Sequence, residues 1–466
     1  MKKTYGVSIG LLAMGLAVLG APVSKAQSRM AASESSGGSE PLMASAESVP
    51  ATPGASSPED LQKRIDALKA ELADLNTELA TETSTTPAAE AQDQSAPTPA
   101  PAAAPAPAPL PTPAMSGPLA TGIPHELSAG PFGKIEVTGI LSGIGLYSNS
   151  PFYTGDEGHE DISNAQVFIQ KTSGWFQFYL QGGAYNLPVV GVPFAKTTDT
   201  VSGSFGPFPV GYVKLVKGSF SAEIGKLPTL IGDEYTFTFE NMNVERGLLW
   251  NQEPAISRGI QLNDSYKKLS VSFSWNDGLY SNRFTSFSGL LAYAINGSNT
   301  LTFAAGGNAG VYDKNSGATF LYQNNQQIYN LIYTFTKGPV TISPYYQYTV
   351  VKSADTVYGT GAHTNGGAIL ANYNFKHGIS LSVRPEYIRS SGSIATGEAN
   401  LLGYGPGTGA YSFTVTPTWV KDAFFLRGDL SVVHLTNFVV GSDAGFGIGG
   451  TGTNQIRGVV EAGFMF

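Results

Sequence analysis

Residues 134–466 alternate strand-like segments of 7 to 14 residues with connections that are short, then long, then short again. In 269–276 (LSVSFSWN), the Leu, Val, Phe and Trp side chains share one parity, and the Ser and Asn side chains share the other. Successive side chains of a strand point to opposite faces, so this segment has one apolar and one polar face. Residues 411–419 (YSFTVTPTW) repeat the pattern. The region therefore predicts a large sheet whose two faces meet different surroundings.

Periodicity predicts sixteen strands, and the connections between them follow a rule. The strands are expected at 134–147, 165–172, 175–185, 210–217, 220–226, 257–263, 269–275, 286–296, 300–307, 327–336, 340–349, 366–375, 379–390, 411–420, 424–434 and 457–466. The even-numbered strands up to the fourteenth precede tight turns, and the odd-numbered ones precede connections of roughly 10 to 30 residues. Short periplasmic turns and an even strand number are typical of single-chain bacterial barrels. We therefore predict an all-β membrane protein, a 16-stranded antiparallel up-and-down transmembrane β-barrel over 134–466.

Composition supports apolar faces that meet lipid and polar faces that meet a wet lumen. The 466 residues are only 13% charged and include 56 Gly, 22 Tyr, 25 Phe and no Cys. After the first 25 residues, no stretch is apolar enough for a membrane helix. The barrel region carries 20 basic and 22 acidic residues, so its near neutrality indicates no nucleic-acid partner.

Aromatic and proline residues add detail to the expected barrel wall. Aromatics such as Trp175 and Trp419 gather beside the short turns, as in an interfacial girdle. Pro344, Pro385 and Pro417 fall inside predicted strands on the lipid-facing parity, where each forfeits a ladder hydrogen bond. We expect β-bulges there, or misplaced strands.

The chain begins with features of an exported protein. Residues 1–26 combine Lys2, Lys3, an apolar run and Ser24-Lys25-Ala26, which predicts a secretory signal peptide. An uncleaved membrane anchor is the alternative. Residues 27–57 are rich in Ser, Ala, Gly and Glu, and we predict that they are disordered.

Residues 58–80 predict a short coiled-coil helix. Pro58 at the first helical position and the early carboxylates of Glu59 and Asp60 favour a helix start. The 4-3 spacing of the apolar residues gives an unbroken heptad seam of Leu61, Ile65, Leu68, Leu72, Leu75 and Leu79. The seam predicts a small parallel oligomer, and the alternative is an amphipathic helix resting on another surface. Residues 81–133 are rich in Pro, Ala and Thr, which predicts an extended, semi-rigid periplasmic linker.

The chain stops in a strand that ends with Phe466, and it combines a signal peptide, heptad, Pro/Ala spacer and barrel. With the segment 225–262 (GKLPTLIGDEYTFTFENMNVERGLLWNQEPAISRGIQL), this architecture resembles the OmpL-like β-barrel porins and the trimeric dicarboxylate-type porins with an N-terminal coiled coil. The resemblance implies a Gram-negative outer-membrane porin for small hydrophilic solutes. It also implies a homotrimer among outer-membrane lipid and lipopolysaccharide, with its N-terminal extension in the periplasm, where it could contact the cell wall.

The third long connection, 227–256, is the longest and carries Asp233, Glu234, Glu240 and Glu245. In general porins the third external loop similarly folds into the lumen. Apolar residues such as Phe237, Phe239 and Trp250 give this loop reason to pack inside the barrel. An external loop packed on its neighbours is the alternative.

Strand parity then nominates a charged pore wall. The candidates sit opposite apolar neighbours: Lys214, Glu223, Arg384, Glu386, Arg427, Asp429, Arg457 and Glu461, joined by Arg258 after the third long connection. A Lys or Arg that faces lipid at mid-bilayer costs about 2 to 4 kcal/mol, so we expect these charges to face water. They would form a basic wall opposite an acidic loop and select solutes. Alternatively, neighbouring charges such as Arg384 and Glu386 simply neutralise each other.

Other chemistry finds little support in the sequence. The five His residues lack metal-ligand spacing, and no hydrolase or phosphate-loop motif is present, so we expect no enzyme activity, metal or cofactor. Carboxylates within 155–161 could hold a divalent cation or form a solvated loop. The second functional hypothesis is a structural barrel that tethers the outer membrane to the cell wall through the coiled coil, with little conduction. An outer-membrane hydrolase lacks a candidate triad.

Overall fold

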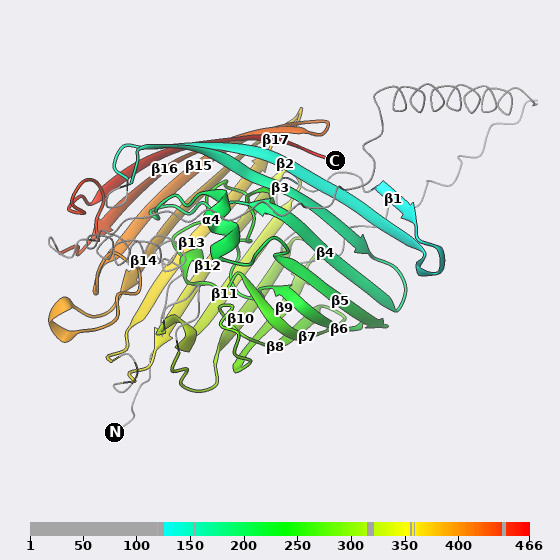
Figure 1. Ribbon diagram of the computed structural model, residues 1–466, viewed down its shortest axis with the longest axis horizontal. Coiled ribbons are helices and arrows are strands. Elements are labelled where there is room, and N and C mark those ends of the chain that lie inside the picture. The colour runs from blue at the N-terminus through cyan, green and yellow to red at the C-terminus, as the bar shows by residue number, and fades with distance from the viewer. Residues whose placement is uncertain are drawn as a thin grey trace, which may run out of the picture. The chain divides into compact units, whose positions relative to one another are not determined.

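The computed structural model describes residues 119, 125–151, 155–314, 321–354, 357, 359–439 and 444–466. Sixteen antiparallel strands, β2 to β17, pair in chain order, and β17 pairs with β2, so the wall closes (Figure 1). The structure thus confirms the 16-stranded barrel. The predicted signal peptide, coiled coil and most of the linker lie outside the described residues.

Each predicted strand is present. The bounds are β2 (Lys134–Ser148), β3 (Gly158–Lys171), β4 (Phe176–Tyr185), β5 (Val210–Lys217), β6 (Phe220–Pro228), β7 (Ile256–Tyr266), β8 (Leu269–Asn276), β9 (Ser286–Asn296), β10 (Asn299–Asn308), β11 (Gln326–Lys337), β12 (Val340–Val351), β13 (His363–Asn374), β14 (Ile379–Ser390), β15 (Gly409–Lys421), β16 (Phe424–Thr436) and β17 (Asn454–Met465). A further short strand, β1 (His125–Ser128), pairs with the start of β2. The main difference is β3, which begins at Gly158 where we expected Ala165, because its first residues lack the apolar alternation that marks a lipid-facing segment.

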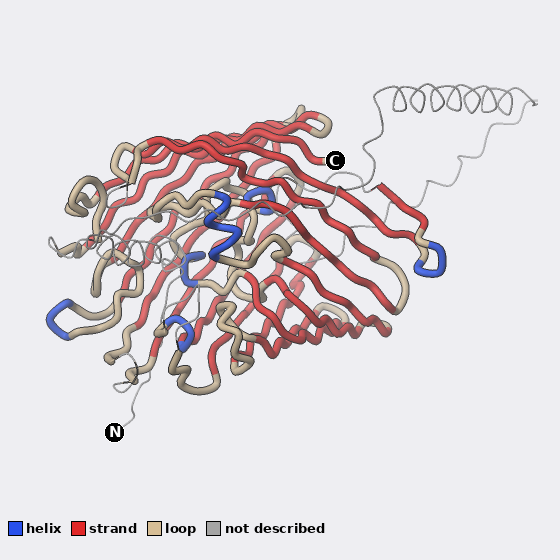
Figure 2. The backbone as a smooth tube through the Cα atoms, viewed as in Figure 1, coloured by secondary structure: helices blue, strands red, loops and turns tan. Residues whose placement is uncertain are grey.

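Within the described residues, helix is limited to single turns and one short element (Figure 2). These are α4 (Thr197–Gly203) and the 3-10 turns η2 (Gly130–Phe132), η3 (Thr238–Glu240), η4 (Trp250–Gln252), η5 (Gln323–Asn325) and η6 (Ile394–Thr396). Among the described residues, no helix has the length and apolar character needed to cross a membrane.

The alternation of the strands separates two faces of the wall. In β14, Ile379 and Leu381 are exposed on one face, whereas Ser380, Ser382 and Arg384 are buried on the other. Exposed aliphatic and aromatic side chains follow the same rule around the whole wall, and polar side chains occupy the opposite parity. The apolar face is therefore the outer face, and the polar face is the inner face.

The expected bulges at the prolines are wrong. Pro344, Pro385 and Pro417 lie on the outer face, and on one side of each the strand pairing is interrupted and then resumes in the same register. Because proline only lacks a donor, a local break in the ladder is sufficient and no extra residue is inserted. The register shifts that the described strands show lie elsewhere, at Ser142/Gly143 and Asn299/Thr300.

Candidate functional site

The connection between β6 and β7, residues 229–255, lies against the inner face of the wall. Its aromatic side chains are buried: the Phe239 ring lies 5.5 Å from that of Phe168 in β3, and the Phe237 ring lies 5.2 Å from that of Tyr185 in β4. Trp250 is also buried. We call residues 229–255 the inner loop. Burial of large apolar side chains gives a loop of this composition a reason to fold inward.

Arg384 of β14 joins the inner loop to the wall. Its guanidinium lies 2.6 Å from the Glu234 carboxylate and 3.1 Å from that of Glu386, and it donates to the Glu245 carbonyl at 2.7 Å. The side chain is fully buried. The planar fork of arginine suits such a site, because it holds carboxylates and backbone carbonyls together in fixed directions.

Two further arginines hold the loop at neighbouring strands. Arg457 of β17 is 2.7 Å from the Glu245 carboxylate, and Arg427 of β16 donates to the Asn241 carbonyl at 2.7 Å. The Asp429 carboxylate accepts from the Glu245 amide at 2.7 Å. Thus Arg384, Arg427 and Arg457 each bind the irregular backbone or a carboxylate of the inner loop.

Glu461 of β17 completes this side of the loop–wall contact. It accepts a hydrogen bond from the Thr238 hydroxyl at 2.7 Å and lies 3.6 Å from Arg427. With its neighbours Arg384, Glu386, Arg427, Asp429 and Arg457, it is nearly inaccessible to solvent. The expectation that these six charges face water is therefore wrong. Parity correctly put them on the inner face, but the inner loop covers them.

Other candidates stand apart from this network. Lys214 of β5 pairs with Glu223 of β6 at 2.8 Å on the inner face. Arg258 shares the parity of exposed Ile260, pairs with buried Asp277 at 2.8 Å and lies 3.9 Å from the Tyr280 ring centroid. It therefore belongs to the outer face, and its assignment to the basic wall is wrong. The prediction relied on the position of Arg258 after the third long connection, whereas its parity with Ile260 indicates the outer face.

Sequence reasoning missed several residues that position the inner loop. The Gln252 side-chain carbonyl accepts from Thr349 at 3.0 Å and from Thr364 at 2.7 Å, and its backbone carbonyl accepts from Gln326. The inward parity of these wall residues was a usable signal. A second connection, between β4 and β5, also contributes: its Val192 carbonyl accepts from Arg457 at 2.7 Å. The local sequence gives no sign of that contact.

Burial changes the ionisation of the inner-loop charges. It raises the pKa of Asp233 and Glu234 to about 7, and Arg384 only partly offsets this for Glu234. Burial also raises the pKa of Glu240 and Glu253 well above the ordinary value for glutamic acid. For Arg246, burial lowers the pKa to about 10.

Burial is the largest cause of each of these shifts. The inner loop carries five carboxyl groups and one arginine, whereas the eight inner-wall candidates are four basic and four acidic residues. The loop is therefore the acidic side of the loop–wall contact, and protonation of its carboxyl groups lowers the charge that is buried there.

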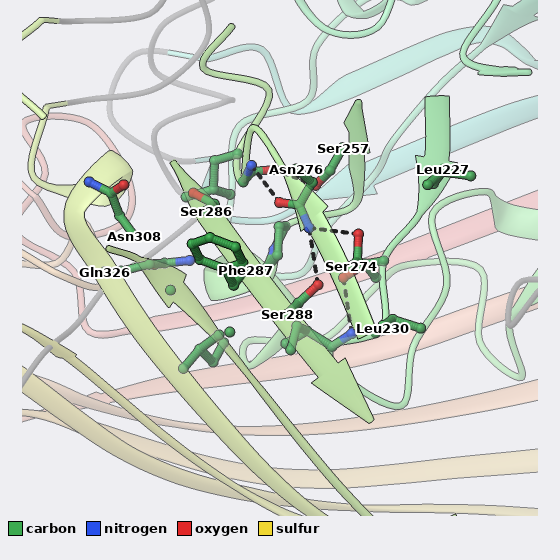
Figure 3. A pocket seen from close by; sticks show the side chains of 18 of the residues that line it. Leu227, Leu230, Ser257, Ser274, Asn276, Ser286, Phe287, Ser288, Asn308 and Gln326 are labelled. Atoms are coloured by element: carbon green, nitrogen blue, oxygen red, sulfur yellow. Dashed lines mark hydrogen bonds between the residues drawn. The ribbon is translucent and has the colours of Figure 1, made fainter. Parts of the chain in front are cut away.

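A narrow cavity remains on the opposite side of the inner loop, against β7 to β11 (Figure 3). Its volume is about 30 Å³, which is room for about two water molecules. The wall contributes hydroxyl and amide side chains, namely Ser257, Gln261, Ser274, Asn276, Ser286, Ser288, Asn308 and Gln326. The inner loop contributes Leu230 and Ile231. Among the described residues that line the cavity, none is charged.

The carboxylates of 155–161 take a structural role instead of gathering around a cation. Asp161 lies in β3, and its side chain accepts from the Thr197 amide at the start of α4, at 2.6 Å. In the part of the chain that the structure describes, no group of three or more acidic, His or Cys side chains is placed to hold a metal ion.

Comparisons with known proteins agree with this architecture. The anion-selective porin from Comamonas acidovorans matches with a TM-score of 0.50 at 12% identity, covering 71% of this chain and 99% of that one. The outer-membrane expressed OmpT of Vibrio cholerae matches with a TM-score of 0.49 at 11% identity (73% and 100% covered), and the Salmonella typhi OmpF complex with daunomycin with 0.46 at 13% (73% and 100%). At 12% identity, the likeness to the Comamonas porin shows the fold alone.

A search among curated protein sequences finds no match. The family model described as "Putative beta-barrel porin-2, OmpL-like" matches residues 134–466, which is the whole of the sixteen-stranded barrel. The chain therefore belongs to the OmpL-like beta-barrel porin-2 family.

Proposed function

We propose that this protein is an outer-membrane porin through which small hydrophilic solutes diffuse passively, with the inner loop as its constriction. The observation that carries the proposal is a closed barrel whose outer face is apolar and whose inner face is polar. The apolar outer face is suited to contact with lipid, and the polar inner face is suited to a water-filled lumen. In this proposal the arginine network anchors the loop, and solutes pass along the opposite wall.

The narrowness of the cavity favours a second candidate, a structural barrel that tethers the outer membrane to the cell wall and conducts little. The cavity of about 30 Å³ has room for about two water molecules, so the inner loop must shift before a sugar can enter. The inner loop meets this side of the wall mainly through apolar contacts, in which Ile231 packs with Ala304 and Ile328. These contacts are the ones that would yield as a solute enters.

Planar-bilayer recording on the purified full-length protein separates the two candidates. The porin proposal expects discrete channel steps, each small for a 16-stranded barrel because the inner loop fills most of the lumen. Folded, heat-stable protein that inserts into the bilayer and gives no steps at any voltage would leave the tether as the better account.

We further propose that the protein is a homotrimer in the outer membrane and that the heptad seam, within a periplasmic extension, helps to hold it together. The seam lies outside the described residues. Replacing Leu68 and Leu72 with Asn should lower the trimer fraction of detergent-purified protein, because a polar residue at a core position weakens a coiled coil. Sedimentation velocity measures the result. Ala70→Asn with Thr77→Asn, on the opposite side of the same helix, is the matched control, and equal loss of trimer in both variants would contradict the role of the seam.

A further inference from the structure

The cavity in Figure 3 differs from the rest of the barrel interior in its chemistry. Asn276 donates to Ser274 at 2.9 Å and to Ser288 at 3.1 Å, so one side is a fixed row of hydroxyl and amide groups. The facing side is apolar and includes Leu230 and Leu279. A ligand that fits both sides needs an apolar face and many hydroxyl groups.

Unpaired amide atoms at the cavity also favour a ligand with hydroxyl groups. Asn308 Oδ1, Gln326 Oε1 and both Asn324 amide atoms have no hydrogen-bond partner among the described residues. All three side chains are more than nine-tenths buried, at 8%, 5% and 7% exposed. Three unpaired acceptors and one unpaired donor therefore lie along the passage. A hydroxyl group satisfies both kinds of atom because it donates and accepts.

The charges around the cavity also favour an uncharged solute. Among the described residues on this side of the barrel, the ion pairs are each internally compensated: Arg258 with Asp277 at 2.8 Å, Lys214 with Glu223 at 2.8 Å, and Arg283 with Asp313 at 3.0 Å. The arginines 384, 427 and 457 are buried against the far side of the inner loop. An ion that enters the passage would shed hydration without meeting a countercharge, whereas a neutral solute would not.

From these observations we propose that the passage favours uncharged polyhydroxylated solutes of the size of a monosaccharide over ions of equal size. This inference rests on the proposed porin function and names its solute class. Hydroxyl groups of the solute would bind Asn308, Asn324 and Gln326, and its C–H face would slide along Leu230 and Ile231.

The test measures the flux of radiolabelled glucose, glucosamine and gluconate into proteoliposomes that contain the full-length protein. The three solutes have nearly the same size and differ in charge. Glucose should enter at least about ten times faster than either ion. If gluconate or glucosamine enters as fast as glucose, the inference is overturned and the porin function stands. If no solute enters and no channel steps occur, both fail.

Substitution of Asn324 connects the flux to the site. Both of its amide atoms are unpaired, so Asn324→Leu removes no hydrogen bond within the described residues and should fold. It should lower the ratio of glucose to gluconate flux several-fold. Asn324→Asp should instead favour glucosamine over gluconate by about tenfold, since it adds a charge without a partner. Asn365→Leu, an exposed amide on the outer face, is the control. Unchanged flux ratios in both Asn324 variants would overturn the assignment.

Discussion

Replacing Arg384 with alanine should release the inner loop, increase the single-channel conductance several-fold and lower the free energy of unfolding by about 3–5 kcal/mol. The side chain binds Glu234 and the Glu245 carbonyl of the loop while it pairs with Glu386 on its own strand. Its removal leaves two carboxylates and a carbonyl buried without their donor. Buried charges that lose a partner cost far more than exposed ones, so the loop should move out to rehydrate them.

Planar-bilayer recording and urea unfolding of the same preparation measure the two effects. Arg283→Ala is the matched control, because Arg283 also pairs with a carboxylate but both partners are half exposed, and about 0–1 kcal/mol is expected there. A second variant, Arg384→Met with Glu234→Gln, removes the charges on both sides of the contact and should recover part of the stability. If Arg384→Ala alters ion selectivity but neither conductance nor stability, the arginine lines the pore and does not anchor the loop.

The contrast between strands and loops explains what the sequence could predict. Side-chain parity is a local property, so the alternation within a segment such as 269–276 was enough to predict a strand and the orientation of its side chains. Parity also put Arg384 and Arg427 on the inner face. Parity could not predict whether the inner face meets water, because that depends on the inner loop. The loop residue that contacts Arg384, Glu234, is 150 residues away from it in the sequence.

Arg258 shows the opposite limit. Its place at the end of the third long connection suggested a basic wall, yet its parity is that of the exposed Ile260, and the buried Asp277 and the Tyr280 ring hold its side chain. No sequence motif predicted the uncharged cavity. Its Ser, Asn and Gln residues on the wall come from five strands, β7 to β11, and singly they are ordinary inward-facing polar residues. What distinguishes them is that the inner loop faces them with the apolar Leu230 and Ile231 and leaves a cavity of about 30 Å³.

The stability of the barrel should decrease as pH rises from 5 to 9. Burial raises the pKa of Asp233 from its ordinary 3.8 to about 7 and that of Glu234 from 4.5 to about 7. Between those values the folded protein binds more protons than the unfolded chain, so the free energy of unfolding decreases across this window. The shifts at Glu240 and Glu253 extend the decrease to higher pH.

Charge balance gives the direction of this effect. The inner loop becomes more negative as pH rises, because the raised pKa of Asp233 and of Glu234 places their loss of protons near pH 7. The loop should then bind less firmly, so conductance should rise with pH while the urea midpoint decreases. Both are measured on wild type and on the Glu240→Gln, Glu253→Gln double variant, in which the decrease above pH 7 should flatten.

Asp233→Asn should flatten the lower part of the same curve, between about pH 4 and pH 7, because it removes one of the two groups that titrate there. Asp313→Asn, at an exposed carboxylate, is the control and should keep the wild-type dependence. A urea midpoint that rises from pH 5 to pH 9 would mean that these carboxylates are ionised and stabilising in the folded barrel. Ionised inner-loop carboxylates would then strengthen the contacts with Arg384 and Arg457 at neutral pH.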